Sequence, residues 1–287
     1  MKKLFLLSLS VLFCSILVSA KDLIKVLIVT GQDEPHNWET SSMILQKRLN
    51  ESGLFFADIA LSPKKGEDMS SFRPQFSAYK AVILNYVGDP WCEAMKSAFV
   101  EYVKKGGGVV VFHSGNNTFS DWKAYNEIIG LGGWDNRNEK DGPYVYYKDG
   151  KIVRDYTPGP GGSHGRQHEF TVTLRNKKHP ITKGLPESWV HAKDELYDRL
   201  RGPALNLTVL ATAFSDPSTG GSGRDEPVMM TIKRGKGRIF HTVLGHVGNE
   251  ETHPAVECTD FIVTFLRGTE WVATGKVTQK VPADFPQ

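Results

Sequence analysis

Cysteine and net charge are both scarce in this sequence of 287 residues, and each scarcity excludes a class of protein. Of the 3 cysteines, only Cys92 and Cys258 lie beyond the N-terminal segment, so a fold stapled by several disulfides is excluded. We expect these two thiols not to pair. The formal net charge is +3, which argues against nucleic acid as a partner, because a nucleic-acid-binding surface needs an excess of basic residues.

Long apolar runs are also rare, and the one that exists lies at the N-terminus. Met1-Lys2-Lys3 precedes an uncharged run at residues 4–18, which meets the small residues Ser19-Ala20. This order is typical of a cleavable signal peptide, and the run is shorter than the ~20 residues that a membrane-spanning helix needs. A retained N-terminal anchor is the alternative. We expect residues 1–20 to be a signal peptide and the mature protein, starting at Lys21, to be periplasmic or secreted and free of the membrane.

The short motifs of common cofactor and metal sites are missing as well. The chain has no His-Glu-x-x-His, no Cys-x-x-Cys and no glycine-rich phosphate loop followed by lysine. We therefore expect no nucleotide cofactor. A metal site, if there is one, must be assembled from residues that lie far apart in the sequence.

What is present, in the first half, is an alternation of short apolar runs with helical patterns. Residues 25–30 form a β-branched run stopped by Gly31, typical of a strand buried on both faces. Asn37 is a candidate N-cap for a helix. The alternation predicts an α/β fold, a doubly wound, mostly parallel sheet flanked by helices. The further elements predicted here are strands at 55–61, 81–86 and 109–112, and helices at 37–53 and 92–105.

The second half is less regular. Residues 132–166 are rich in glycine and tyrosine and follow neither period, so we expect a long loop insertion ordered by its aromatic residues. No linker divides the chain, which predicts one domain over residues 21–275 and a surface tail over residues 276–287. The regular elements predicted in this half are strands at 168–174 and 207–214, a hairpin over 228–244, and a helix at 256–267.

Three polar residues lie at or just after predicted strand ends. His36 and His113 follow the first and fourth strands, and Asn85 stands near the end of the third. Ligands of open parallel sheets bind beyond the carboxyl ends of the strands. We therefore expect these side chains to lie on the same side of the molecule.

Three motifs give the chain a resemblance to a known family. They are the stretch from Gly106 to Ser114, the tetrad Asp194-Glu195-Leu196-Tyr197, and Gly235-Lys236-Gly237-Arg238 leading to Gly245-His246. In this order they resemble the trehalose-utilisation, or ThuA-like, family, and the resemblance covers residues 24–267. It implies a flavodoxin-like fold similar to that of class I glutamine amidotransferases, and a role in the use of trehalose and similar disaccharides.

The same resemblance implies that the chain is not a glutaminase. Amidotransferases carry a nucleophilic cysteine in the turn after the strand equivalent to 109–112, where this chain has His113-Ser114. Ser114 with His246 as its base is an alternative nucleophile, but the glycine-x-serine-x-glycine context is missing.

The remaining candidates are three histidines and a carboxylate. We expect His36, His113, Glu195 and His246 to share a crevice, with His113, Glu195 and His246 as catalytic residues. Imidazoles and a carboxylate suit either general acid/base catalysis or a divalent metal such as zinc, for which His36, His113 and His246 are the candidate ligands. The sequence leaves both roles open.

Several nearby residues have plainer explanations. Strand alternation turns His241 away from its neighbours, so we expect a structural role for it. We expect Asp194 to form surface ion pairs and His179-Pro180 to shape a turn. His164 and His168 flank the long loop, within reach of the crevice.

The expected substrate is a small carbohydrate. Aromatic rings stack on the apolar faces of sugars, and the residues expected to bind substrate are His36, Trp38, Asn85, Ser114, Trp134 and Tyr144. The family resemblance implies a disaccharide such as trehalose or an oxidised (keto) glycoside, handled by a hydrolase or isomerase, with a sugar oxidoreductase as a partner. The alternative is a sugar-binding module without catalysis.

Overall fold

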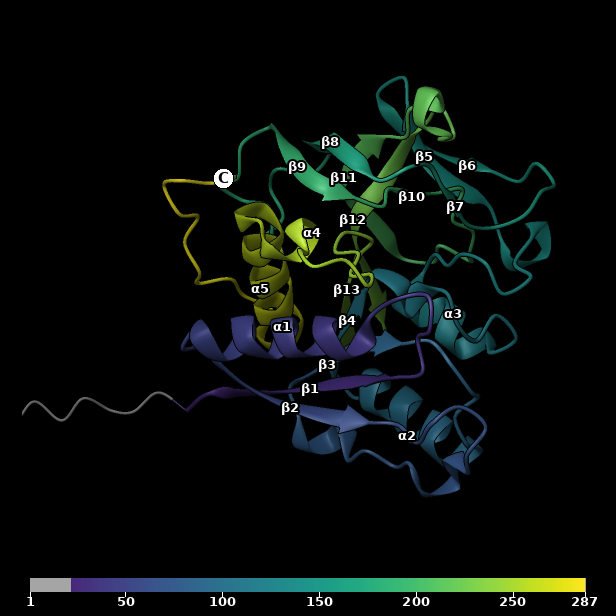
Figure 1. The fold of residues 1–287 in the computed structure, drawn as a ribbon, viewed down its shortest axis with the longest axis vertical. Helices are drawn as coiled ribbons and strands as arrows, with labels where there is room; N and C mark the ends of the chain where they lie inside the picture. The colour runs from purple at the N-terminus through teal and green to yellow at the C-terminus, as the bar shows by residue number, and fades with distance from the viewer. Residues whose placement is uncertain (1–21, 287) are drawn as a thin grey trace, which may run out of the picture.

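A mixed β-sheet with helices on both faces forms the body of the protein (Figure 1). The computed structural model describes residues 22–286. The expected signal peptide, residues 1–20, and the expected first mature residue, Lys21, lie outside the described residues.

One half of the sheet is parallel. Its strand order is β2-β1-β3-β4-β13, and every neighbouring pair in it runs in parallel. The strands β3 and β4 are buried along their whole length, which explains their continuous apolar sequences. These strands are β1 (Ile24–Gly31), β2 (Phe55–Leu61), β3 (Ala81–Tyr86), β4 (Gly108–Phe112) and β13 (Gly237–Thr242).

The other half is antiparallel and continues the same sheet from β13 in the order β12-β11-β8-β9. It lies at the top of Figure 1. Its strands are β12 (Asp225–Arg234), β11 (Leu207–Phe214), β8 (His168–Leu174) and β9 (Ser188–Asp194), and a separate two-stranded sheet pairs β7 (Ser163–His164) with β10 (Tyr197–Asp198).

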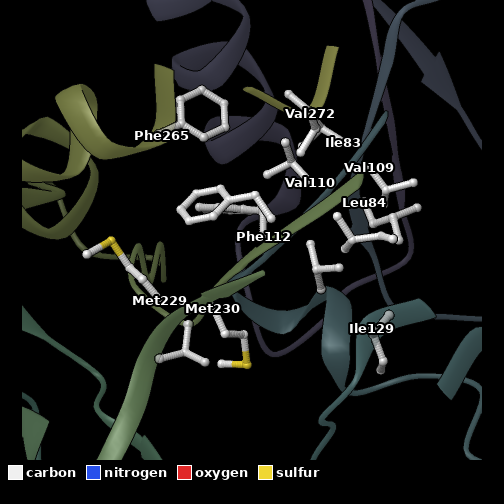
Figure 2. Close-up of a cluster of buried hydrophobic side chains, with 14 of the residues drawn as sticks. Ile83, Leu84, Val109, Val110, Phe112, Ile129, Met229, Met230, Phe265 and Val272 are labelled. Carbon is white, nitrogen blue, oxygen red and sulfur yellow. The ribbon is translucent and has the colours of Figure 1, made fainter. Parts of the chain in front are cut away.

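The helices α1 and α5 cover one face of the sheet, and α2 and α3 cover the other (Figure 1). In Figure 2, Phe265 and Val272 of α5 lie with Val110 above β4, whereas Ile129 of α3 lies below it. Both faces of the central strands β3 and β4 are therefore closed to water, whereas the edge strand β2 keeps Phe56, Ile59 and Leu61 exposed. The helices are α1 (Trp38–Glu51), α2 (Glu93–Lys104), α3 (Lys123–Ile129), α4 (Pro254–Glu257) and α5 (Thr259–Thr274), with short 3-10 helices at Met69–Ser71, Phe76–Ala78, His113–Asn116 (η3), Glu139–Asp141 and Pro217–Thr219.

This architecture confirms the predicted α/β class. Asn37 caps α1, because its side chain accepts a hydrogen bond from the Thr40 amide at 3.0 Å. The predicted strands in the first half match β1 to β4 closely, and the hairpin predicted over residues 228–244 is β12–β13.

The predicted long loop is the part that the sequence described wrongly. Within residues 132–166 the strands β5 (Tyr144–Lys148) and β6 (Lys151–Asp155) form a hairpin. The hairpin joins the main sheet where Tyr147 of β5 pairs with Asp225, the first residue of β12. Its turn is Asp149-Gly150, with φ of 49° and 81°, which is the conformation that Asp-Gly favours in two-residue hairpins. The turn was therefore readable in the sequence.

The remaining predictions concern the cysteines and the C-terminal end. Cys92 and Cys258 are free thiols. The segment 276–286 lies on the surface, yet Val277, Val281 and Phe285 pack against the core. Within residues 22–286, none of the helices has the length and apolar character that crossing a membrane requires.

Candidate active site

Four predicted residues meet at the carboxyl ends of the parallel strands. His36 lies in the loop after β1, His113 begins η3 after β4, Glu195 follows β9, and His246 follows β13. One side-chain donor atom from each lies within 4.8 Å of the others. The crevice that the sequence predicts is therefore formed by residues from both halves of the sheet.

His113 offers a free nitrogen to this group. Its Nδ1 lies 2.6 Å from the Val243 carbonyl oxygen, which can only accept, so Nδ1 carries the proton and Nε2 carries a lone pair. The ring is only 1% exposed, and Nε2 has no hydrogen-bond partner. Burial lowers the pKa of His113, so its imidazole is neutral near pH 7 and ready to act as a ligand or a base.

His36 is oriented in the same way by a carboxylate. Asp33, itself 1% exposed, accepts a hydrogen bond from His36 Nδ1 at 2.9 Å and a second one from the Ser114 hydroxyl. His36 Nε2 then faces the site, 3.1 Å from the Tyr197 hydroxyl. A carboxylate behind a histidine is the usual outer contact of a metal-ligating imidazole.

Glu195 supplies the negative charge. Its Oε2 lies 3.1 Å from His246 Nδ1 and 3.7 Å from His113 Nε2. Burial opposes ionisation of Glu195, but the facing imidazoles of His113 and His246 hold its pKa well below the ordinary value. Burial likewise opposes the charged form of His246, and the Glu195 carboxylate outweighs it and raises the pKa of His246.

The donor set fits a divalent metal. His113 Nε2 and His246 Nδ1 are both buried and make no aligned hydrogen bond, although both lie within ion-pair distance of the Glu195 carboxylate, at 3.7 Å and 3.1 Å. Buried polar atoms are nearly always hydrogen-bonded, so two nitrogens that converge on a carboxylate without aligned hydrogen bonds suit a shared cation. Three imidazole nitrogens and one carboxylate oxygen are ligands that zinc accepts.

A cavity of about 290 Å³ opens onto this group. No lysine or arginine lines it, and its charged groups are the carboxylates of Asp33 and Glu195 and the histidines; the rest of the lining is apolar, aromatic or amide. The lining residues are Asp33, Pro35, His36, Val87, Asn117, Trp134, His164, Glu195, Tyr197 and His246.

Of the residues expected to bind sugar, Trp134 and His36 line the cavity, whereas Trp38, Asn85, Ser114 and Tyr144 do not. Trp38 is the first residue of α1. The Asn85 side-chain amide donates hydrogen bonds of 2.9 Å to the hydroxyls of Ser41 and Ser42 in that helix.

Ser114 and Tyr144 are also held by other contacts. The Ser114 hydroxyl donates to Asp33, and Ser114 is only 1% exposed. Tyr144 donates to the Pro160 carbonyl, and the Arg201 guanidinium covers its ring at 3.5 Å. These residues therefore support the fold around the cavity rather than line it.

Of the other histidines, one lines the cavity and the rest lie outside it. His164 reaches the cavity, with Nε2 3.9 Å from Glu195 Oε1, but His168 does not line it. His241 is structural, as expected, since its two ring nitrogens contact the Ile129 carbonyl at 2.8 Å and the Asn116 amide at 2.9 Å. His179 accepts a hydrogen bond from the Ile181 amide within the predicted turn.

Asp194 is where the sequence interpretation was wrong. It is 1% exposed rather than on the surface, and it accepts hydrogen bonds from the amides of Glu195, Gly245 and His246. Sequence reasoning also missed Asp33, Asn117 and Tyr197. Asp33 lies in the same loop as His36, and Tyr197 lies in the same tetrad as Glu195. Closeness in sequence to a candidate residue could therefore have identified both.

Comparisons with known proteins identify the family of this chain. The family model described as ThuA, trehalose utilisation, matches residues 25–272. The structure of a ThuA-like protein from Parabacteroides merdae is 55% identical, with a TM-score of 0.90 over 93% of this chain and 95% of that one. A ThuA-like protein from Bacteroides uniformis, 20% identical, has a TM-score of 0.56 over 89% of this chain and 93% of that one, and shows the fold alone. A search of curated proteins found no match.

Proposed function

Because the chain belongs to the ThuA trehalose-utilisation family, we propose that it is an exported enzyme that processes a neutral sugar at a divalent metal ion such as zinc. The substrate is a disaccharide such as trehalose or an oxidised (keto) glycoside. One observation carries the proposal: the buried nitrogens of His113 and His246 converge on the Glu195 carboxylate without aligned hydrogen bonds, with His36 beside them.

The protein groups have distinct tasks in this scheme. His36, His113, Glu195 and His246 would hold the ion, which would supply a Lewis acid for a sugar oxygen. Burial raises the pKa of Tyr197 well above its ordinary value, so its hydroxyl keeps its proton, which His36 Nε2 accepts in this structure and which a substrate oxygen would accept once His36 bound the ion. His164 lines the cavity and is exposed, so its ring can contact a bound sugar.

The cavity lining supports a neutral sugar. A phosphate or carboxylate group would need a cationic partner, and no lysine or arginine lines the cavity. Trp134 supplies an apolar ring for the C–H face of a sugar, and its amide is fixed by a 2.7 Å hydrogen bond to the Gly161 carbonyl. Asn117 offers an amide to sugar hydroxyls. An oxidised glycoside as substrate would make a sugar oxidoreductase the natural partner.

A metal-free enzyme is the second candidate. In it His113, with its lowered pKa, acts as general base, and the Glu195–His246 pair acts as the charged partner. A sugar-binding module without catalysis is the third. The concentration of titratable groups in the cavity favours an enzyme over a binding module.

The test combines metal analysis with turnover. Purified mature protein should contain about one zinc-class ion per chain, and it should convert trehalose or a keto derivative in a chromatographic assay. His113→Ala and Glu195→Gln should each lower turnover by about 10² or more, whereas His168→Gln, outside the cavity, should leave it unchanged.

Three other results would change the conclusion. Turnover without metal would select the acid/base enzyme. Sugar-induced thermal stabilisation without turnover would select the binding module. Intact-mass analysis that finds Met1 on membrane-bound protein would remove export from the proposal.

A further inference from the structure

Behind the four site residues lies a second, fully buried group, Asp194, His191 and Asp260, which does not line the cavity. Its centre is Asp194, whose two carboxylate oxygens together accept four hydrogen bonds. Three come from the amides of Glu195 at 2.7 Å, Gly245 at 2.7 Å and His246 at 2.9 Å. A carboxylate has about four acceptor positions, so Asp194 is saturated.

The fourth hydrogen bond comes from His191. Its Nε2 lies 2.9 Å from Asp194 Oδ2, and its Nδ1 lies 2.7 Å from Asp260 Oδ2. Asp260 stands in the first turn of α5 and also accepts the Trp189 indole hydrogen at 2.8 Å. The relay Asp260–His191–Asp194 thus joins α5 and β9 to the segment that follows β13.

Asp194 touches the main chain of two of the four site residues but none of the site cavity. Glu195 and His246 come from segments 51 positions apart along the chain, and no ladder pairs β9 with β13. The segments that carry them would otherwise be free to shift relative to each other.

We propose that Asp194, held by His191 and Asp260, is a positioning residue that fixes the backbone of Glu195 and His246 in the geometry of the metal centre. The inference rests on the proposed function for its metal, but the relay itself consists of contacts within this chain.

A competing explanation is a second metal site. His191, Cys258 and Asp260 each offer a donor atom, and these atoms lie within 4.8 Å of one another. However, both nitrogens of His191 already face carboxylates, and the Cys258 thiol lies 3.6 Å from the Ala255 carbonyl, a contact that suits a donated S–H. Burial also raises the pKa of Cys258, which opposes the thiolate that a metal would need. The geometry favours the relay.

The test compares substitutions of two buried carboxylates, Asp260 of the relay and Glu270 outside it, in the full mature protein. Asp260→Asn breaks the charge of the relay, and Trp189→Phe, a milder change, removes one donor to Asp260. The matched control is Glu270→Gln, since Glu270 is 2% exposed and accepts hydrogen bonds from the amides of Thr278 and Gln279 far from the site. The measurements are zinc affinity by chelator competition, the cobalt absorption spectrum, thermal stability, and amide hydrogen exchange without metal.

Losing a direct outer partner of a metal ligand usually weakens binding by about 10- to 100-fold, and Asp260 acts through His191 and Asp194, so the proposal expects Asp260→Asn to weaken zinc binding by about 10-fold. The cobalt spectrum should change, and the Glu195 and His246 amides should exchange faster. Trp189→Phe should shift the same quantities less. Glu270→Gln should lower stability while leaving zinc affinity, spectrum and these amides as in wild type.

The failures are distinguishable. If wild type binds no zinc, the proposed metal function is wrong, and exchange at Glu195 and His246 still decides whether the relay positions them. If Asp260→Asn and Trp189→Phe lower stability alone, with affinity and exchange unchanged, the relay is only structural. A second bound cobalt with a thiolate absorption band would overturn the relay in favour of a metal site at Cys258.

Discussion

Two histidines on neighbouring strands have opposite surroundings. His241 lies within β13, His113 follows the end of β4, and these strands pair in parallel with His241 opposite Val111. Both side chains are buried, with 0% and 1% exposure. His241 has both nitrogens in hydrogen bonds, whereas His113 Nε2 has none. Burial alone therefore does not separate the two histidines, but the free Nε2 of His113 does, and it is the reason why His113 and not His241 is proposed as a site residue.

The largest expected effect is on the stability of the His241 region in acid. Burial lowers the pKa of His241 to about 4 from the ordinary 6.5, so the unfolded chain binds a proton more readily than the folded one. The stability from neutral His241 is present above pH 6.5 and is lost as the pH falls toward 4, by about 3 kcal/mol in all.

The control for this prediction is His241→Gln, which does not titrate in that range. Denaturant unfolding from pH 7 to 4 should give a steeper loss of free energy for wild type than for the variant. Parallel curves would contradict the lowered pKa of His241 in the folded protein.

The next effect concerns His113 and the stabilisation of the folded protein by zinc. Zinc at 100 times its dissociation constant should stabilise wild type by about 2.7 kcal/mol, because it binds the folded chain only. His113→Ala should lose this stabilisation entirely, and His241→Gln should keep it. Thermal unfolding with and without zinc measures both. Equal responses of the two variants would contradict the distinction between open and satisfied histidines.

A smaller effect separates two tryptophans. Trp134 lines the cavity and Trp38 does not, although the sequence favoured both as sugar contacts. Trp134→Ala should weaken sugar binding about tenfold, equivalent to roughly 1.4 kcal/mol, through loss of ring contact. Trp38→Ala should leave it unchanged. Isothermal titration with trehalose and its keto derivative is the measurement, and a matching loss in Trp38→Ala would move the sugar to the α1 side.

The smallest effect is expected at the cysteines. Cys92 and Cys258 are the N-caps of α2 and α5, and neither lines the cavity. Turnover by the double serine variant should equal that of wild type. A large loss with the fold intact would mean that a thiol takes part in the chemistry.

The central strands of the parallel half were predictable because they are buried on both faces. The sequences of β1, β3 and β4 are largely continuous apolar runs, and the rule that ligands bind at carboxyl ends placed His36 and His113 together. The same rule placed Asn85 there, but it gives strand ends and not side-chain contacts. Asn85 instead bonds the hydroxyls of Ser41 and Ser42.

The antiparallel half was harder because burial there depends on distant partners. In β9, Val190 is 57% exposed while His191 is fully buried, the reverse of an ordinary apolar pattern. His191 can be buried because Asp260, 69 positions away, and Asp194 hold both of its nitrogens. Asp194 was misjudged for the same reason, since three of its partners are backbone amides that no composition or period reveals.

The backbone at the site has a consequence for engineering this protein. His113 has φ of 39° and Trp134 has φ of 53°, a left-handed conformation that only glycine adopts without strain. A search for thermostable variants that ranks substitutions by folding free energy would favour glycine at both positions. Such a search would delete the proposed metal ligand and the proposed sugar contact in exchange for relief of backbone strain, so both positions should be held fixed in any library.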